Sequence, residues 1–339
     1  MADTQELSEA KRAHLSKYLR SEGSRISTDR ADRQDRQDKQ NNSSNTRKKR
    51  PDLPTGVVAI QTGGSRRPFF FLHGDWINGA YWCFPLAHGL GTDQPFYALE
   101  PYTFESLPPS LETIAAAHIQ SLQAIQPEGP YALGGFCNGA LLAYEMARQL
   151  SKAGHKIDIL VLMDPMGLVY SARYRLTCAA LRWLGKLVHI SEEKQLYTYI
   201  LIRHINEYLK FPHYRKSRAS WPWNVYKPLK AQDEESKSAS LLARIQSFFP
   251  PAEAIHLDYS CIYDWTAVRY RPTDLYPNKI TFFWDREEPF HRNGWRKTYE
   301  TNEVEIHIIP GTQMACRTTY LPTLTEHLRK CLDKLHVVN

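Results

Sequence analysis

The stretch from Tyr131 to Leu150, YALGGFCNGALLAYEMARQL, decides how the rest of the chain is interpreted. Its first residues form a short apolar run that is typical of a buried strand. From Ala140 onward the apolar residues follow helical spacing, and Gly154 is placed to end the helix. Between strand and helix lies Gly135-Phe-Cys-Asn-Gly139, which has the spacing of the strand–turn–helix motif G-x-S-x-G with cysteine in the serine position.

Cys137 is therefore a candidate nucleophile. A side chain at such a sharp turn needs small neighbours two residues away on each side, and Gly135 and Gly139 meet that need. The thiol would project from the carboxyl end of the strand beside a helix N-terminus, which stabilises both a thiolate and a developing oxyanion. The alternative is a glycine-rich loop that holds a buried, unreactive cysteine.

The chain has 339 residues, enough for one large domain or two small ones. Its first 15 residues are polar and lack the apolar segment of a signal peptide, and no window approaches a membrane span. None of the six cysteines lies in C-x-x-C spacing, which argues against zinc and thioredoxin-like redox sites. We therefore expect a cytoplasmic protein without a metal, whose thiols are free at Cys83, Cys137, Cys178, Cys261, Cys316 and Cys331.

The net charge of +7 is concentrated near the N-terminus. Residues 1–50 contain 13 Lys and Arg against 8 Asp and Glu, so five of the seven excess positive charges lie there. The rest of the chain is nearly neutral, and we do not expect it to bind nucleic acid.

Residues 1–55 precede the first apolar strand and indicate a helix followed by a linker. Leu7–Arg20 has the spacing of an amphipathic helix, which would either dock on a partner or remain solvated. Ser21–Arg50 is polar and repetitive, so it cannot bury enough apolar surface to fold alone, and we predict a disordered linker. The domain boundary is placed between residues 55 and 56.

From residue 56 to the end of the chain, apolar strand-like runs alternate with helical patterns. Seven strands are predicted, at 57–60, 68–72, 95–99, 131–133, 157–163, 279–284 and 304–309. The helices expected among them cover 80–89, 111–125, 140–153 and 320–335. This alternation, with nearly continuous apolar strands, predicts an α/β fold with a doubly wound, mostly parallel sheet.

The alternation is interrupted between Met163 and Lys279, which are too far apart for a single crossover. Helical patterns lie within this interval near 176–188, 193–209 and 238–249. We interpret residues 168–275 as an inserted helical lid over the edge where the strands end, since such folds place their sites there. The alternative is additional helical packing without a role at the site.

Five motifs, taken in order, resemble a known family. They are Phe69-Phe-Phe-Leu-His-Gly-Asp75, Gln94-Pro-Phe-Tyr-Ala-Leu99, Ile125-Gln-Pro-Glu-Gly-Pro-Tyr131, the stretch from Gly134 to Ala147, and Val161-Leu-Met-Asp164. Together they are similar to the type I thioesterase domains that terminate nonribosomal peptide and polyketide synthases. The resemblance runs from residue 56 to the C-terminus, strongly at first, weakly in the lid, and again from Tyr276. It implies an α/β-hydrolase fold with an inserted lid.

The resemblance also implies roles for individual residues. Cys137 matches the nucleophile. Asp164, after the next strand, matches the acid that orients a catalytic histidine, although a strand-end Asp that caps a loop is the alternative. The backbone N–H groups of Asp75 and Asn138 match the two donors of an oxyanion hole.

Four further residues match known positions in such folds, and we expect different roles for them. His73 lies near the mouth of such sites, and we favour a structural role for it. Tyr144 and Glu145 match family positions on a helix, where packing and a local hydrogen bond are expected. Asp285 stands where many α/β-hydrolases carry their acid, which makes it the second candidate after Asp164.

The family's catalytic histidine lies after the last strand, where this chain has Ile309-Pro-Gly-Thr-Gln313. Glutamine has no titratable proton and cannot act as a general base. Its amide can still hydrogen-bond Asp164 on one side and the Cys137 sulfur on the other, which preserves geometry without proton transfer. Cysteine in place of serine is compatible with the chemistry, because a thiol ionises at a pKa of about 8.5 and attacks thioesters well.

Three explanations for Gln313 remain open. The first is loss of activity. The second is partial activity, in which Cys137 accepts an acyl group without a base, hydrolysis is slow, and a neutral amine is the working acceptor. The third is a substitute base, for which the candidates are His291, His307 and His327.

We therefore expect a thioesterase or acyltransferase that forms a Cys137 acyl-enzyme in nonribosomal peptide or polyketide biosynthesis. Its substrates would be acyl or peptidyl thioesters on the phosphopantetheine arm of a carrier protein, and it would need no cofactor of its own. Lid cations such as Arg215 and Lys216 would face an acidic carrier domain or be solvated. The alternative is a catalytically impaired pseudo-thioesterase that binds acyl chains or carrier proteins. A carboxylesterase is disfavoured because cysteine nucleophiles handle thioesters better than oxygen esters.

Overall fold

The computed structural model describes residues 53–74, 79–101, 108–166, 172–210, 258–272, 274–285, 295, 298 and 302–336. The chain divides into two units, Met1–Asp52 and Leu53–Asn339, and the described residues all belong to the second. The predicted helix at 7–20, the linker at 21–50 and the lid helix at 238–249 lie outside these residues. The predicted boundary between residues 55 and 56 stays a prediction.

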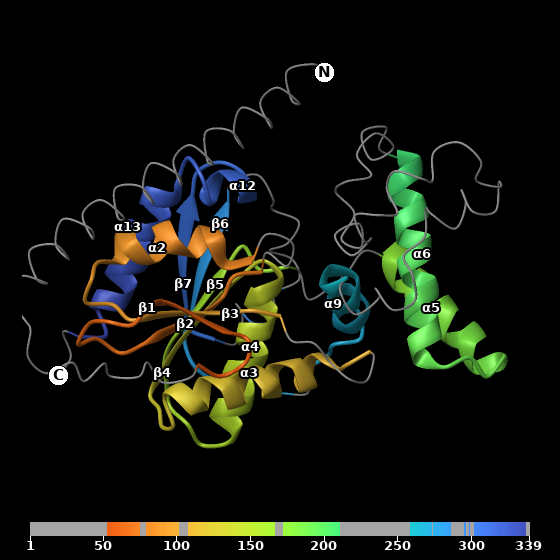
Figure 1. The fold of residues 1–339 in the computed structure, drawn as a ribbon, viewed down its shortest axis with the longest axis horizontal. Coiled ribbons are helices and arrows are strands. Elements are labelled where there is room, and N and C mark those ends of the chain that lie inside the picture. Colours follow the sequence, from red (N-terminus) through yellow and green to blue (C-terminus); the bar gives the residue numbers. More distant parts are fainter. Residues whose placement is uncertain are drawn as a thin grey trace, which may run out of the picture. The chain divides into compact units, whose positions relative to one another are not determined.

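All seven predicted strands are present and form one sheet in the order β1-β3-β2-β4-β5-β6-β7 (Figure 1). Only β1 is antiparallel to its neighbour, and the other pairs are parallel. The predicted mostly parallel sheet is therefore confirmed. The strands are β1 (Val57–Gln61), β2 (Phe69–Leu72), β3 (Phe96–Leu99), β4 (Tyr131–Phe136), β5 (Ile157–Met163), β6 (Ile280–Asp285) and β7 (Val304–Ile309).

Helices cover both faces of the sheet, with α2 and α13 on one side and α3 and α4 on the other (Figure 1). Two apolar clusters fill the space on the two faces. Because the central strands are buried on both faces, they need continuous apolar runs, which is why Phe69–Leu72 is apolar at every position. Among the described residues, every helix falls short of what a membrane crossing requires in length and apolarity.

The helices follow the predicted pattern with two additions. They are η1 (Gly79–Trp82), α2 (Cys83–Leu90), α3 (Leu111–Ile125), α4 (Asn138–Lys152), α5 (Ala172–Leu187), α6 (Glu192–Lys210), α9 (Tyr259–Ala267), α12 (Gln313–Cys316) and α13 (Leu321–Asp333). The segment predicted as one helix at 80–89 starts as a 3-10 turn, and α2 tolerates Pro85 because it lies in the first helical turn. The sequence patterns predict neither α9 nor α12.

The insertion falls between β5 and β6, as predicted, and has a small apolar core of its own. Cys178 of α5, Ile200 of α6 and Trp265 of α9 are buried together in this core. The Thr266 hydroxyl donates to the Pro109 carbonyl at 2.9 Å, which ties α9 to the segment before α3. A role for the insertion as a lid stays a prediction.

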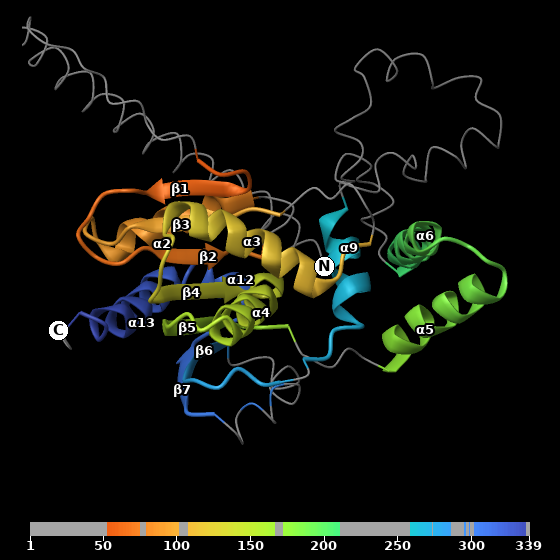
Figure 2. The ribbon, with the colours of Figure 1, turned by 90° about the horizontal axis from the view of Figure 1, so that it is seen from below.

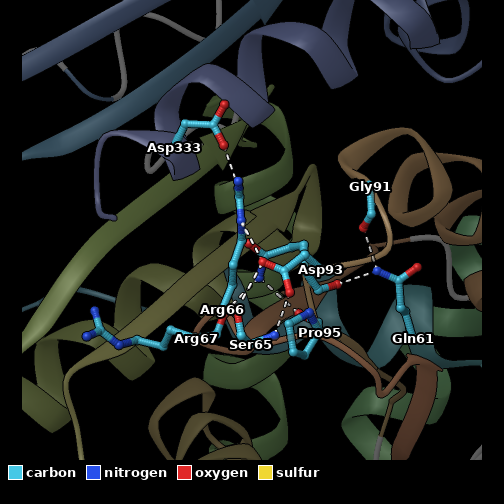
Figure 3. A network of polar contacts seen from close by, with 9 residues as sticks. Gln61, Ser65, Arg66, Arg67, Gly91, Asp93, Pro95 and Asp333 are labelled. Carbon is cyan, nitrogen blue, oxygen red and sulfur yellow. Dashed lines mark hydrogen bonds and ion pairs between the residues drawn. The ribbon is translucent and has the colours of Figure 1, made fainter. Parts of the chain in front are cut away.

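Polar contacts fasten the loop between β1 and β2 to two other segments (Figure 3). The Arg66 guanidinium lies 2.5 Å from Asp333 in α13 and 3.5 Å from Asp93 before β3. The Ser65 N–H donates to the Asp93 carboxylate at 2.6 Å. Because this network precedes β2 and β3, it holds the edge where the parallel strands begin and leaves the opposite edge for a site.

Candidate functional site

The middle strand of the sheet, β4, leads directly into α4 (Figure 2). Cys137 lies between the end of β4 and the start of α4. Its backbone angles, φ 53° and ψ −117°, are strained for a residue with a side chain. The Cys137 N–H donates to the Met163 carbonyl at 2.9 Å, and the Cys137 carbonyl accepts the Met166 N–H at 3.3 Å. The end of β5 and the loop after it therefore hold this strained turn, residues 135–139, in place. We call this turn the elbow.

Two glycines allow neighbouring backbone to close around this turn. A Cβ atom on Gly139 would lie 2.2 Å from the Leu72 carbonyl oxygen, and one on Gly74 would lie 2.0 Å from that of Phe136. Gly74 also has a φ of 67°, which a side chain would strain. The end of β2 and the residues after it thus lie against the turn. Asp75, the predicted second oxyanion donor, follows immediately but lies outside the described residues.

The Cys137 thiol is surrounded by groups that act on its ionisation in opposite directions. Burial raises the pKa of the thiol to about 11, and the Asp164 carboxylate acts in the same sense. Hydrogen bonding to the Gln313 side chain and to the Asn138 N–H, together with the Arg317 guanidinium, lowers that pKa. Gln313 and Asn138, both candidate residues from the sequence, therefore lie close enough to the sulfur to affect its ionisation.

The two candidate acids come to the same edge of the sheet. Asp164 follows β5 in a left-handed conformation with φ 42°, and its N–H donates to the Phe283 carbonyl of β6 at 2.7 Å. Asp285 is the last residue of β6, and both carboxylates act on the buried Cys316 thiol, raising its pKa to about 12 after the larger effect of burial. Of the two carboxylates, that of Asp164 affects the pKa of the Cys137 thiol, and the choice between Asp164 and Asp285 as the acid stays a prediction.

Gln313 reaches the site through a short helix at the end of β7. The Thr312 hydroxyl accepts the Ala315 N–H at 3.3 Å, which caps α12 at its first turn. One turn after Gln313, the Arg317 guanidinium carbon lies 5.1 Å from the centre of the Phe136 ring, just before the nucleophile. This cation–π contact places a positive charge near the thiol. Sequence reasoning missed Arg317, because its role depends on a contact with Phe136, which is far away in the chain.

Two of the three candidate substitute bases, His307 and His327, contact each other away from the site. His307 of β7 lies 3.1 Å from the His327 ring nitrogen, 3.1 Å from Glu305 and 3.3 Å from the Cys331 sulfur. Both histidines are thus engaged in a cluster between β7 and α13. His291 lies outside the described residues.

Tyr144 and Glu145 make the structural contacts expected of them. Glu145 is fully buried in α4, where it accepts two hydrogen bonds of 2.7 Å from Arg148 and one of 2.5 Å from the Tyr270 hydroxyl. The Tyr144 hydroxyl accepts the Tyr276 N–H at 3.2 Å. These contacts fix α4 to the segment that leads into β6.

His73 is fully buried at the end of β2, and its Nε2 atom lies 3.4 Å from the Glu100 carboxylate. Burial and the nearby His73 ring lower the pKa of His118 in α3 to about 3, so that second imidazole is neutral. These positions agree with a structural role for His73.

Comparisons with known proteins find similar chains. A family model described as a thioesterase domain matches residues 69–332. Chondramide synthase cmdD from Chondromyces crocatus is 27% identical over 295 residues, which are 82% of this chain and 7% of the synthase. A dimodular nonribosomal peptide synthase from Bacillus subtilis (strain 168) is 34% identical over 112 residues, 32% of this chain and 5% of the synthase. The chain therefore spans only a small part of either relative's length.

One solved structure resembles most of the chain. In the crystal structure of a four-domain nonribosomal peptide synthetase bound to AMP and glycine, the match covers 84% of this chain and 21% of the synthetase chain. Its TM-score is 0.51 and its sequence identity 18%, a likeness that supports the α/β fold alone.

Proposed function

Because the chain belongs to the thioesterase domain family, we propose that it is a thioesterase or acyltransferase in which Cys137 attacks the carbonyl of an acyl or peptidyl thioester. The observation that carries this proposal is the strained turn that places Cys137 at the carboxyl end of β4 and directly before α4, held there by backbone hydrogen bonds with Met163 and Met166. A strained nucleophile beside a backbone donor is the arrangement that acyl transfer requires.

The first step is acylation. The Cys137 thiolate attacks the thioester carbon, the bond to the leaving sulfur breaks, and the leaving thiolate takes a proton from solvent. The Asn138 N–H and, by family resemblance, the Asp75 N–H donate hydrogen bonds to the carbonyl oxygen as negative charge develops on it. Arg317 stabilises the attacking thiolate before the bond forms.

The second step is the release of the acyl group, and Gln313 limits it. Attack by water needs a general base, which a glutamine side chain cannot provide. Gln313 hydrogen-bonds the sulfur but transfers no proton. The role that we propose for Asp164 is to orient the Gln313 side chain. A neutral primary amine is a much stronger nucleophile than water and attacks the acyl carbon without a base; the bond to Cys137 then breaks, and the departing thiolate takes the extra proton from nitrogen.

The substrate that we propose is an acyl or peptidyl group on the phosphopantetheine arm of a carrier protein. One relative that supports it is named as a dimodular nonribosomal peptide synthase. The carrier protein would be the partner, and the reaction would belong to nonribosomal peptide or polyketide biosynthesis in the cytoplasm. The phosphopantetheine arm belongs to the substrate, and no cofactor of the enzyme is proposed.

A second candidate is a catalytically impaired module that binds acyl chains or carrier proteins. Two observations favour it, the glutamine at position 313 and the thiol pKa of about 11, which leaves little thiolate at neutral pH. This candidate keeps the fold and the oxyanion donors but forms no covalent intermediate.

A burst assay separates the two candidates. The protein is mixed with an excess of an acyl N-acetylcysteamine thioester, a small mimic of the phosphopantetheine arm, and the released thiol is followed with time. We expect one thiol per protein in a first phase, then a slow phase that a primary amine accelerates. Cys137→Ala is the control and should show neither phase. Release without a stoichiometric phase, equal in the native protein and in Cys137→Ala, contradicts the enzymatic proposal.

A further inference from the structure

A second group of reactive side chains lies in the insertion, away from the elbow. It consists of His204 in α6 and of Asp258 and Cys261 at the start of α9. One ligand atom from each of the three lies within 4.8 Å of the others, and all three side chains are buried. The mechanism proposed above uses none of them.

The contacts within this group orient its ligand atoms. One oxygen of Asp258 accepts the Cys261 N–H at 3.0 Å and caps α9, so the carboxylate is fixed by the helix backbone. The other oxygen lies 2.9 Å from the His204 Nε2 atom. The cap therefore turns one carboxylate oxygen toward the imidazole, on the same side as the thiol.

A second cluster of potential metal ligands among the described residues shows how nearby charges affect cation binding. Glu305, His307 and Cys331 also bring their ligand atoms together, but both oxygens of Glu305 are occupied. Lys334 lies 2.6 Å from one oxygen and Lys279 lies 3.1 Å from the other. Two positive charges against one negative charge repel a further cation.

The charges around His204 are different. The neighbouring cation, Arg203, forms its ion pair with Asp264 and also acts on Asp258 and Cys261 through space, so two carboxylates here stand against one cation. One carboxylate and one thiolate would together neutralise a divalent cation. Sulfur, imidazole nitrogen and carboxylate oxygen are the ligand types that Zn²⁺ takes in proteins.

We propose that His204, Asp258 and Cys261 form a binding site for a thiophilic divalent cation such as Zn²⁺, which fastens α6 to α9. Binding converts the Cys261 thiol to a thiolate and releases its proton to solvent, and the His204 proton that faces Asp258 moves from Nε2 to Nδ1, so that the Nε2 lone pair binds the metal. With bonds of about 2.0–2.1 Å, a tetrahedral metal needs the oxygen and nitrogen about 3.3 Å apart, a small opening from the present contact. Water fills the fourth position.

The site joins two helices that are far apart in the chain. His204 and Asp258 are 54 residues apart in sequence, so a bound ion closes a long segment of the insertion. The ligands have no C-x-x-C spacing, which is why the sequence patterns argued against a metal. Only the packing of α6 on α9 brings them together.

Cobalt is a direct probe, because Co²⁺ replaces Zn²⁺ and gives a visible absorption band when a thiolate binds it. The full chain carries Cys137→Ala in every sample, so that the active-site thiol cannot contribute. We expect a band that saturates at one equivalent of Co²⁺ and disappears when Zn²⁺ is added. Adding Cys261→Ser should abolish the band, and the matched change Cys331→Ser should leave it intact. No band, or a band lost with Cys331→Ser and kept with Cys261→Ser, overturns the proposal.

Hydrogen exchange tests the same site without altering its ligands. One equivalent of Zn²⁺ should slow exchange in peptides from α6 and α9 and leave β7 and α13 unchanged. Slowing confined to β7 and α13, or no change at all, overturns the proposal even if Cys261→Ser fails to fold. Neither readout uses acyl transfer, so failure of the proposed function would leave this result standing.

Discussion

The carboxyl ends of β4 and β7 lie at one edge of the sheet. The end of β4 carries a nucleophile, whereas the end of β7 lacks a general base. The end of β4 has the full geometry of a nucleophile, with Cys137 strained at the turn and Gly139 packed against Leu72. The end of β7 keeps the turn and the capped helix α12, yet the Gln313 side chain has no titratable proton. The difference teaches that backbone packing sets the geometry of a site, whereas a single side chain decides whether protons move.

The largest effect is expected when the missing base is restored at position 313. Gln313→His should raise the hydrolysis rate of an acyl thioester by about 10²- to 10⁴-fold, the usual contribution of a positioned general base. The steady-state release of free acid is the measurement. Gln313→Asn, which keeps an amide, is the matched control and should give no increase. A histidine variant no faster than the native protein would mean that something other than a base is missing.

The pH dependence of the thiol sharpens the comparison next. The uncharged thiol is the form that burial favours, so a pKa of about 11 leaves about one thiolate in ten thousand at pH 7. Alkylation of Cys137 by iodoacetamide, followed by peptide mass mapping, should therefore accelerate about tenfold per pH unit between about pH 7 and 10. A plateau below pH 9 would show that the elbow activates the thiol far more than the structure indicates.

The packing of the elbow is tested by a single methyl group. Gly139→Ala would push a Cβ atom against the Leu72 carbonyl, and we expect it to lower the free energy of unfolding by about 1–3 kcal/mol. Gly63→Ala is the control, because a Cβ atom there meets nothing within 4 Å. Urea denaturation compares the two variants. Equal stabilities would mean that the turn can move aside at little cost.

The smallest expected effect concerns Arg317. Replacing Arg317 by Met removes the positive charge beside the sulfur and should slow alkylation of Cys137 at pH 8 by about two- to fivefold, as for a partly solvated charge pair. Arg317→Lys keeps the charge and should recover most of the rate. If Met and Lys behave alike, packing on Phe136 matters and the charge does not.

Much of the fold could be predicted because its strands are long apolar runs between turn residues. The prediction ended β4 too early, at 131–133, before Gly134 and before Gly135, the first residue of the turn motif. They continue the strand because they pair with Phe71 and Leu72 of β2, an interaction between distant parts of the chain. The gathering of Cys137, Asp164 and Gln313 was predictable, because the carboxyl ends of parallel strands share one edge.

Other features depend on tertiary contacts that no local pattern carries. α9 and α12 are short, and they begin at caps formed by Asp258 and Thr312. The high pKa of the Cys137 thiol comes from burial, whereas the helix N-terminus alone had suggested a lowered value. Arg317 was missed because its significance lies in the aromatic ring that it covers.

The measurement that tests the central claim most directly is the intact mass of the protein after incubation with an acyl thioester mimic. We expect a single acyl adduct on the native chain. The fraction of protein that carries it should increase with pH, and the adduct should persist in water and be removed by a primary amine. Cys137→Ala should gain no adduct. A native chain that gains no adduct even at raised pH would contradict the claim that Cys137 is a working nucleophile, and would leave a binding module on the same fold.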